Sequence, residues 1–256
     1  MFNDTIDITG GAPPVTGTAN AIAFAHALNA RYAGLGAEAL LEAMLCRVFP
    51  GRIALVSSFG TESAVLLHMI ARIEPATTVL FLDTGKLFDE TVRYKDLLAQ
   101  RLGLTGIQVL RPNPADLRDD DREGTLWKFL PDHCCHVRKV VPLSAGLQGF
   151  DAWITGRKRF QGGSRAALPA IEADTDGRLK INPLADWTPA EIAAYFRAHD
   201  LPRHTLEADG YRSIGCAPCT DRVALGEDLR AGRWRHAAKT ECGIHTPIPP
   251  LGACFG

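Results

Sequence analysis

The 256-residue sequence lacks any run approaching the ~20 consecutive apolar residues that a membrane-spanning helix requires. It also lacks a basic N-terminal region, because the first Lys or Arg is Arg31, and this argues against a secretory signal. Excess charge is absent as well, since 28 Lys and Arg face 29 Asp and Glu. A near-neutral chain has no overall attraction for nucleic acids or anionic membranes, so we expect neither as a partner. We expect a protein of the reducing cytoplasm that binds small anions through locally placed arginines.

The seven cysteines carry the most specific chemical signal in the chain. Cys134 and Cys135 are adjacent, and Cys216 and Cys219 form a C-x-x-C pair. Soft thiolates ligate zinc or iron–sulfur clusters, and two distant pairs form one four-thiolate site if the fold brings them together. Adjacent helical residues project about 100° apart, which suits separate iron corners better than one tetrahedral zinc ion. A structural zinc, a vicinal disulfide and a pair of buried apolar thiols remain open alternatives.

Short β-rich runs alternate with amphipathic helices through most of the chain. We predict strands over residues 53–57, 77–82, 107–110, 152–155 and 179–181, and helices over residues 19–30, 37–49, 63–72, 89–102, 134–147 and 189–199. This order predicts an α/β fold in which a parallel, twisted sheet of about five strands is covered by helices on both faces. Cys46 lies in the second predicted helix, where we expect it to be buried as a small apolar side chain.

Three loops that follow predicted strands have the composition of an anion-binding site. They are Ser57-Ser58-Phe59-Gly60-Thr61-Glu62-Ser63, then Leu82-Asp83-Thr84-Gly85, and then residues 155–165 with the cations Arg157, Lys158, Arg159 and Arg165. The carboxyl ends of parallel strands meet at one sheet edge, so these loops predict a nucleotide crevice with a flexible phosphate clamp. The alternatives are an ordinary turn with Ser63 as helix N-cap and a solvated basic loop.

The order of these motifs resembles the adenylyl-sulfate and phosphoadenylyl-sulfate reductases of sulfate assimilation. The resemblance rests on the three loops together with Asp186-Trp187-Thr188, Gly210-Tyr211 and Glu241-Cys242-Gly243-Ile244-His245. It implies a PP-loop (adenine nucleotide alpha hydrolase-like) fold, with residues 1–18 as a flexible leader and residues 19–220 as the nucleotide-binding and iron–sulfur reductase domain. Residues 221–256 would form a mobile C-terminal tail that carries the nucleophile.

The paired cysteines are similar to those of the adenylyl-sulfate-specific branch, which implies a [4Fe–4S] cluster on the four thiolates. The implied activity is thioredoxin-dependent reduction of adenosine 5′-phosphosulfate to sulfite and AMP in cysteine biosynthesis. Cys242 would attack the sulfur to form an S-sulfocysteine, and thioredoxin or a glutaredoxin-like reductant would release sulfite.

Further site residues follow from the same resemblance. It implies substrate contacts for Arg230 and Arg233, and a basic role beside the cluster for Lys139. His245 is a titratable candidate that could lower the pKa of the neighbouring thiol or hold the sulfate. Cys254 is a second tail thiol that lacks the motif, so we expect no redox role for it.

Other functions share parts of this pattern. The basic loop could accept the 3′-phosphate of phosphoadenylyl sulfate, which would give a phosphoadenylyl-sulfate reductase or a dual-specificity enzyme. A PP-loop tRNA thiolase requires a Ser-Gly-Gly-x-Asp-Ser loop and a basic RNA surface, which a near-neutral chain with the residue 57–63 loop does not match. A non-catalytic iron–sulfur redox sensor would not need Cys242 in its motif. The sequence leaves open whether the chain forms a homo-oligomer.

Overall fold

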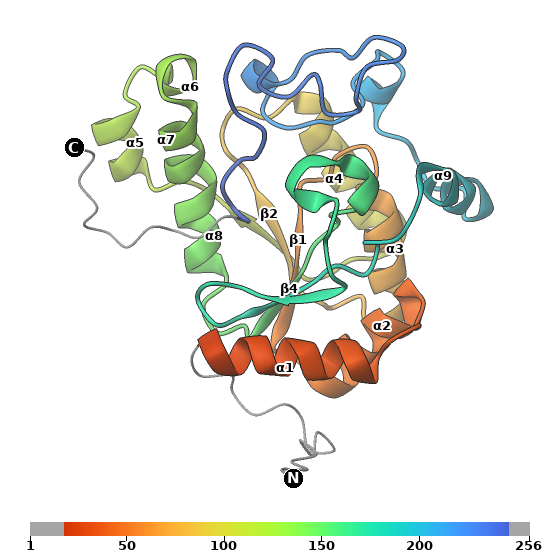
Figure 1. The fold of residues 1–256 in the computed structure, drawn as a ribbon. Coiled ribbons are helices and arrows are strands. Elements are labelled where there is room, and N and C mark those ends of the chain that lie inside the picture. The colour runs from red at the N-terminus through yellow and green to blue at the C-terminus, as the bar shows by residue number, and fades with distance from the viewer. Residues whose placement is uncertain (1–17, 246–256) are drawn as a thin grey trace.

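The computed structural model describes residues 18–245, so almost all of the predicted leader, and Cys254, lie outside the described residues. The strands form one sheet in the order β3-β2-β1-β4-β6-β5 (Figure 1). Its strands are β1 (Ile53–Ser57), β2 (Val79–Leu82), β3 (Ile107–Leu110), β4 (Ala152–Ile154), β5 (Ile171–Ala173) and β6 (Leu179–Ile181). Neighbouring strands are parallel except for β5, which is antiparallel to β6. The predicted α/β class is confirmed.

The edge strand β5 is missing from the sequence-based prediction of about five strands. It has only three residues, its middle residue is the charged Glu172, and Pro169 stands just before it. Such a segment has neither an apolar run nor a clear alternation, so its sequence carries no strand signal. Pairing with β6, in which Glu172 lies opposite Lys180, supplies the order that the segment lacks by itself.

Helices cover both faces of the sheet (Figure 1). One face is covered by α1 (Thr18–Arg31), α2 (Ala37–Ala43), α3 (Ser63–Ile73), α4 (Asp89–Leu102) and α9 (Pro189–Ala198). The other carries α8 (Val141–Gly146), with α5 (Pro114–Asp120), α6 (Leu126–Phe129) and α7 (Pro131–Cys135) beside it. Strand side chains alternate accordingly, so Leu55 and Phe81 enter the larger core while Trp153 enters the smaller core under α8.

Local sequence signals set several helix ends. Thr188 and Glu191 form a reciprocal capping box at the start of α9, and Gly103 ends α4 in the left-handed region with φ 66°. The short helices α5 and α6 were not predicted. The prediction for Cys46 is wrong: this residue is exposed, because the π-helical turn η1 (Met44–Val48) that follows α2 buries Met44, Leu45 and Val48 instead.

Residues 221–245 fold over the carboxyl-terminal edge of the sheet (Figure 1). Thr220 forms a bridge with Arg233, Lys239 pairs with Asp132 of α7, and Arg165 pairs with Glu241. This part of the predicted mobile tail is therefore packed against the domain in the structure. Within residues 18–245, no helix has both the length and the apolar character needed to cross a bilayer.

Candidate active site

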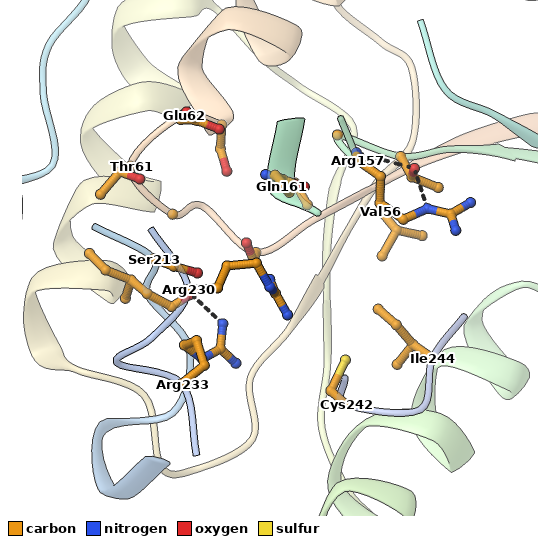
Figure 2. A pocket seen from close by; sticks show the side chains of 18 of the residues that line it. Val56, Thr61, Glu62, Arg157, Gln161, Ser213, Arg230, Arg233, Cys242 and Ile244 are labelled. Carbon is orange, nitrogen blue, oxygen red and sulfur yellow. Dashed lines mark hydrogen bonds between the residues drawn. The ribbon is translucent and has the colours of Figure 1, made fainter. Parts of the chain in front are cut away.

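A pocket with a volume of about 230 Å³ lies at the edge of the sheet where β1, β2 and β4 end. Most of its lining comes from residues 55–66, 82–87, 153–165, 212–215 and 229–245. Figure 2 shows Thr61 and Glu62 across this space from Cys242. The predicted crevice and the predicted nucleophile therefore share one cavity, although they lie far apart in the sequence.

The loop after β1 is fixed by a buried aromatic ring. Phe59 is fully buried in the left-handed region with φ 48°, and its ring packs edge-on against Phe81 at 5.3 Å. Phe59 is therefore an anchor that does not line the pocket, whereas the other six predicted residues of the loop do. Glu62, and not Ser63, occupies the N-cap position of α3, and no side chain among the described residues caps this helix. The N–H of Ser63 donates to Gly60 O at 3.1 Å and that of Val65 to Glu62 O at 3.4 Å, so this end offers an anionic ligand the positive end of the α3 dipole rather than a set of free N–H groups.

The negative charge of Glu62 is neutralised inside the site. Lys158 Nζ lies 2.8 Å from Glu62 Oε2 and also donates a hydrogen bond to Gly156 O at 2.9 Å. Burial lowers the pKa of Lys158, and the neighbouring Glu62 carboxylate partly offsets this effect. Because the two charges cancel locally, Glu62 does not repel an anion that enters the pocket.

The loop after β2 divides its residues between the pocket and the turn itself. Leu82 and Thr84 line the pocket. Asp83 lies outside the lining, where it accepts hydrogen bonds from Gly85 N at 3.1 Å and from Arg111 Nε at 3.0 Å. Asp83 and Gly85 therefore order the turn, and Thr84 Oγ1 lies 3.2 Å from Cys216 Sγ.

The cations of the residue 155–165 loop are held in place by carboxylates from four other positions. The pairs are Arg157 with Glu172, Lys158 with Glu62, Arg159 with Asp186, and Arg165 with Glu241. Arg157, Lys158 and Arg165 line the pocket, whereas Arg159 lies outside it. The sequence suggested a flexible clamp, but in the structure each cation of this loop already has a fixed acidic partner.

Contacts of Glu241 hold the Glu-Cys-Gly-Ile-His motif of the tail in the pocket. The Glu241 carboxylate accepts two hydrogen bonds from Arg165, both at 2.8 Å, and lies 3.3 Å from Arg230. Burial lowers the pKa of Arg230 to about 10. Arg230 and Arg233 line the pocket on the same side of Cys242 (Figure 2). The predicted nucleophile therefore faces a cavity rich in cations, which is suited to an anionic electrophile.

His245 anchors the end of the described tail. Its ring stacks on Trp153 with centroids 5.2 Å apart and an angle of 1° between the planes. Burial holds the pKa of His245 well below its ordinary value, and Arg157, Lys180 and other cations lower it further. A shift in this direction favours the neutral ring, which gives no support to a role for His245 in attracting sulfate by charge.

The four cysteines of the predicted metal site line one small cavity. Cys134 and Cys135 come from α7, whereas Cys216 precedes and Cys219 ends the short 3₁₀ turn η6 (Ala217–Cys219). Burial raises the pKa of the free Cys134 thiol to about 11 and that of Cys135 to about 12, whereas for Cys216 burial is outweighed by Lys139 and neighbouring groups, which lower its pKa. No group of three or more His, Cys, Asp or Glu side chains within residues 18–245 is arranged to hold a metal ion.

Lys139 connects the two cavities. It is buried in the π-helical turn η2 (His136–Val140) and lines both the pocket and the cysteine cavity. Burial opposes its charge, but Cys216, Cys242 and Cys135 together raise the pKa of Lys139. The predicted basic group therefore lies between the nucleophile and the paired cysteines.

Several lining residues were not predicted. Trp153 and Trp234 have ordinary core or tail contexts in the sequence, so no local signal marks them. Gln161 lies inside the basic loop, and Arg212 follows the Gly210-Tyr211 motif, so proximity to a motif was the one available signal for these two residues.

Comparison with known proteins places these features in a wider context. Residues 52–222 match the family described as Phosphoadenosine phosphosulfate reductase domain. The chain is 53% identical over 221 residues to the adenosine 5′-phosphosulfate reductase of Mesorhizobium japonicum, covering 86% of this chain and 87% of that relative. It is 41% identical over 216 residues to the phosphoadenosine 5′-phosphosulfate reductase of Gloeobacter violaceus, covering 82% and 89%.

Solved structures show the same architecture. The phosphoadenylyl-sulfate reductase of Candida auris, in a phosphate complex, superposes with a TM-score of 0.65 at 27% identity, over 78% of this chain and 96% of that one. The FMN adenylyltransferase of Candida glabrata, in complex with FMN and an ATP analogue, has a TM-score of 0.53 at 16% identity, over 91% and 88%. The second likeness concerns the fold alone.

Proposed function

The chain belongs to the phosphoadenosine phosphosulfate reductase family, and we propose that it reduces adenosine 5′-phosphosulfate to sulfite and AMP in sulfate assimilation. The observation that carries this proposal is the presence of Cys242 in the same cavity as the loop after β1. Relatives that are 53% and 52% identical to this chain are named adenosine 5′-phosphosulfate reductases, which supports the choice of substrate.

Substrate binding uses the polar edge of the sheet. The N-terminal end of α3 and the hydroxyls of the residue 57–63 loop suit the adenylate phosphate. Arg230, Arg233 and Lys139 lie on the side of Cys242 and suit the sulfate. This arrangement presents the sulfur atom of the substrate to the thiol and the AMP moiety to the sheet edge.

In the first step the Cys242 thiolate attacks the sulfur atom of the substrate. A sulfur–sulfur bond forms, the bond between sulfur and the bridging oxygen breaks, and AMP leaves with that electron pair. The enzyme then carries an S-sulfocysteine. The surrounding arginines stabilise the negative charge that moves onto the leaving phosphate.

The second step requires an external dithiol, which we propose to be thioredoxin or a related reductant. Its first thiolate attacks Cys242 Sγ, the sulfur–sulfur bond breaks, and sulfite leaves with the bonding pair. Its second thiol then resolves the mixed disulfide and regenerates the Cys242 thiolate. The dithiol thus supplies both electrons and becomes a disulfide.

We further propose that Cys134, Cys135, Cys216 and Cys219 hold a [4Fe–4S] cluster. The donor set fits, because four thiols from two distant segments, three of them buried and that of Cys219 partly exposed, line one cavity. Trp234 also lines this cavity, and its buried Nε1 has no hydrogen-bond partner among the described residues. A cluster sulfur atom is an acceptor for such a donor. When bound, the cluster supplies a fixed charged group beside Lys139 and does not deliver electrons to the substrate.

A second candidate is the reduction of phosphoadenylyl sulfate, because the Gloeobacter violaceus relative is named for that substrate. Each cation of the residue 157–165 loop is already paired with a carboxylate, so a 3′-phosphate would have to break one of these pairs. This favours the substrate without the 3′-phosphate. Competition between the two nucleotides for the same enzyme decides between them.

The assay of the proposed function measures sulfite and AMP formed from adenosine 5′-phosphosulfate and reduced thioredoxin. We expect Cys242→Ser to abolish turnover and Cys254→Ser to retain it. The opposite pattern would transfer the redox role to Cys254 and overturn the assignment.

A further inference from the structure

The residues that follow Cys242 dock in a socket of three side chains. Trp153 of β4, Lys180 of β6 and Asp174, which follows β5, form this tail socket. The His245 ring lies flat on Trp153, and Ile244 packs against the small core cluster that contains Trp153. The socket therefore holds the chain on the C-terminal side of the nucleophile.

Lys180 is the centre of this socket. It lies opposite Trp153 in the β4–β6 register and is only 4% exposed. Its Nζ lies 2.9 Å from Asp174 Oδ1, 5.3 Å from the centroid of the Trp153 ring, and 3.4 Å from His245 O. Trp153 Nε1 donates to the second oxygen of Asp174 at 3.3 Å. The three side chains thus form a closed network, and Lys180 joins it to the tail through the carbonyl oxygen of His245.

Fold stability alone gives a weak reason for a charged residue at this position. Lys180 stands between the buried apolar residues Leu179 and Ile181. A buried ion pair contributes little or no net stability relative to apolar residues of similar size. The charge does, however, meet the tail backbone at the point where the tail docks.

We propose that Lys180 is a positioning residue that keeps Cys242 in the pocket by docking residues 243–245 in the tail socket. This inference rests on the proposed function, because it concerns delivery of the nucleophile in that reaction. Lys180 acts through the His245 carbonyl and through the Trp153 ring, and it does not line the pocket itself.

The socket matters most when substrate is bound. Before Cys242, the tail is held by Glu241, which binds Arg165 and Arg230. An anionic substrate competes for these same arginines, so substrate binding weakens that anchor. The socket shares no side chain with Arg165 or Arg230, and it therefore remains to hold the thiol during the attack.

The test compares Lys180→Met with wild type and with Lys95→Met. Lys95 is a matched control, because it also pairs with an aspartate and lies over an aromatic ring, that of Phe81, but lies outside the pocket lining. In Lys180→Met we expect iodoacetamide to modify Cys242 roughly tenfold faster, since one charge-assisted contact no longer favours the docked tail. Exposed Cys46, followed by peptide mapping, serves as the internal reference.

Single-turnover kinetics give the second measurement. With adenosine 5′-phosphosulfate and no reductant, we expect sulfonation of Cys242 to be roughly tenfold slower in Lys180→Met, with the substrate Kd changed by less than about twofold. Lys95→Met should match wild type in both measurements. A purely structural role for Lys180 would lower the unfolding midpoint without changing the modification of Cys242 relative to Cys46.

The outcomes separate this inference from the proposed function. If Lys180→Met shows wild-type rates of both alkylation and sulfonation of Cys242, the positioning role proposed for Lys180 is overturned. If wild type forms no S-sulfocysteine at Cys242, the proposed reaction is refuted. The alkylation rates would still show whether Lys180 holds the tail in the socket. If Lys180→Met fails to fold, Lys180→Met/Asp174→Asn, which leaves no bare carboxylate, is measured instead with the same expected results.

Discussion

Replacement of Glu241 by glutamine is expected to strengthen substrate binding without slowing sulfonation at saturating substrate. Glu241 occupies two N–H groups of Arg165 at 2.8 Å and lies 3.3 Å from Arg230, in a site where the Arg165 and Glu241 side chains are 11% and 20% exposed. An anionic substrate must displace this carboxylate to reach the same arginines. The wild-type tail therefore competes with the ligand whose reaction it serves.

The magnitude follows from the change in hydrogen-bond type. Glu241→Gln keeps the shape and one acceptor oxygen but replaces charge-assisted hydrogen bonds by neutral ones, a difference of about 1.5 kcal/mol. Released arginines then bind substrate roughly tenfold more tightly. Bound substrate displaces this carboxylate in the wild type as well, and the tail socket then holds Cys242, so the sulfonation rate at saturating substrate should change by less than about twofold.

Calorimetry on a Cys242→Ser background measures substrate affinity without turnover, and single-turnover kinetics on the native thiol measure the rate. Glu227→Gln is the matched control, because Glu227 accepts two hydrogen bonds from Arg235 on the same tail, both at 3.0 Å, and neither residue lines the pocket. Weaker substrate binding in Glu241→Gln than in Glu227→Gln would refute the competition.

Three other predictions concern separate parts of the structure. Burial lowers the pKa of His204, which is 1% exposed, from 6.5 to about 4. As the pH falls, His204 therefore becomes protonated in the unfolded chain before it does so in the folded protein. The free energy of unfolding falls by about 3 kcal/mol between about pH 6.5 and pH 4 as a result. In urea unfolding across this pH window, His204→Gln should lose less of its free energy of unfolding than wild type. An equal loss would show that His204 is not the group responsible. Lys158→Met leaves Glu62 as an unpaired anion in the pocket, so substrate affinity should fall roughly tenfold or more in a binding titration, and unchanged affinity would count against the pairing. Anaerobically purified protein should contain about four irons and absorb near ~400 nm, and Cys216→Ser should lose both signals; stoichiometric zinc instead would exclude the cluster.

The sequence contained enough information for the main architecture. Apolar runs marked five of the six strands, and amphipathic periodicity marked the long helices, because both depend on local patterns of burial. The edge strand β5 depends on pairing with β6, so its own three residues could not reveal it. The exposure of Cys46 was missed for a similar reason, since a π-helical turn changes which side chains face the core.

The sequence indicated which residues belong to the site more completely than it indicated the contacts between them. The two cysteine pairs, the residue 57–63 loop and Cys242 were expected near one another, and the structure brings them to one sheet edge. The pairing of the basic loop could not be predicted, because Glu172 lies on the missed strand and Glu241 lies on the tail. The lowered pKa of His245 was also hidden, since it depends on packing against Trp153 and on cations from distant segments.

The measurement that tests the central claim most directly is mass spectrometry of the protein mixed with adenosine 5′-phosphosulfate in the absence of reductant. The account predicts a mass increase of about 80 Da, one SO₃ unit, on the peptide that contains Cys242, and loss of this adduct when thioredoxin is added. An unmodified Cys242 peptide, or an adduct located on Cys254, would contradict it.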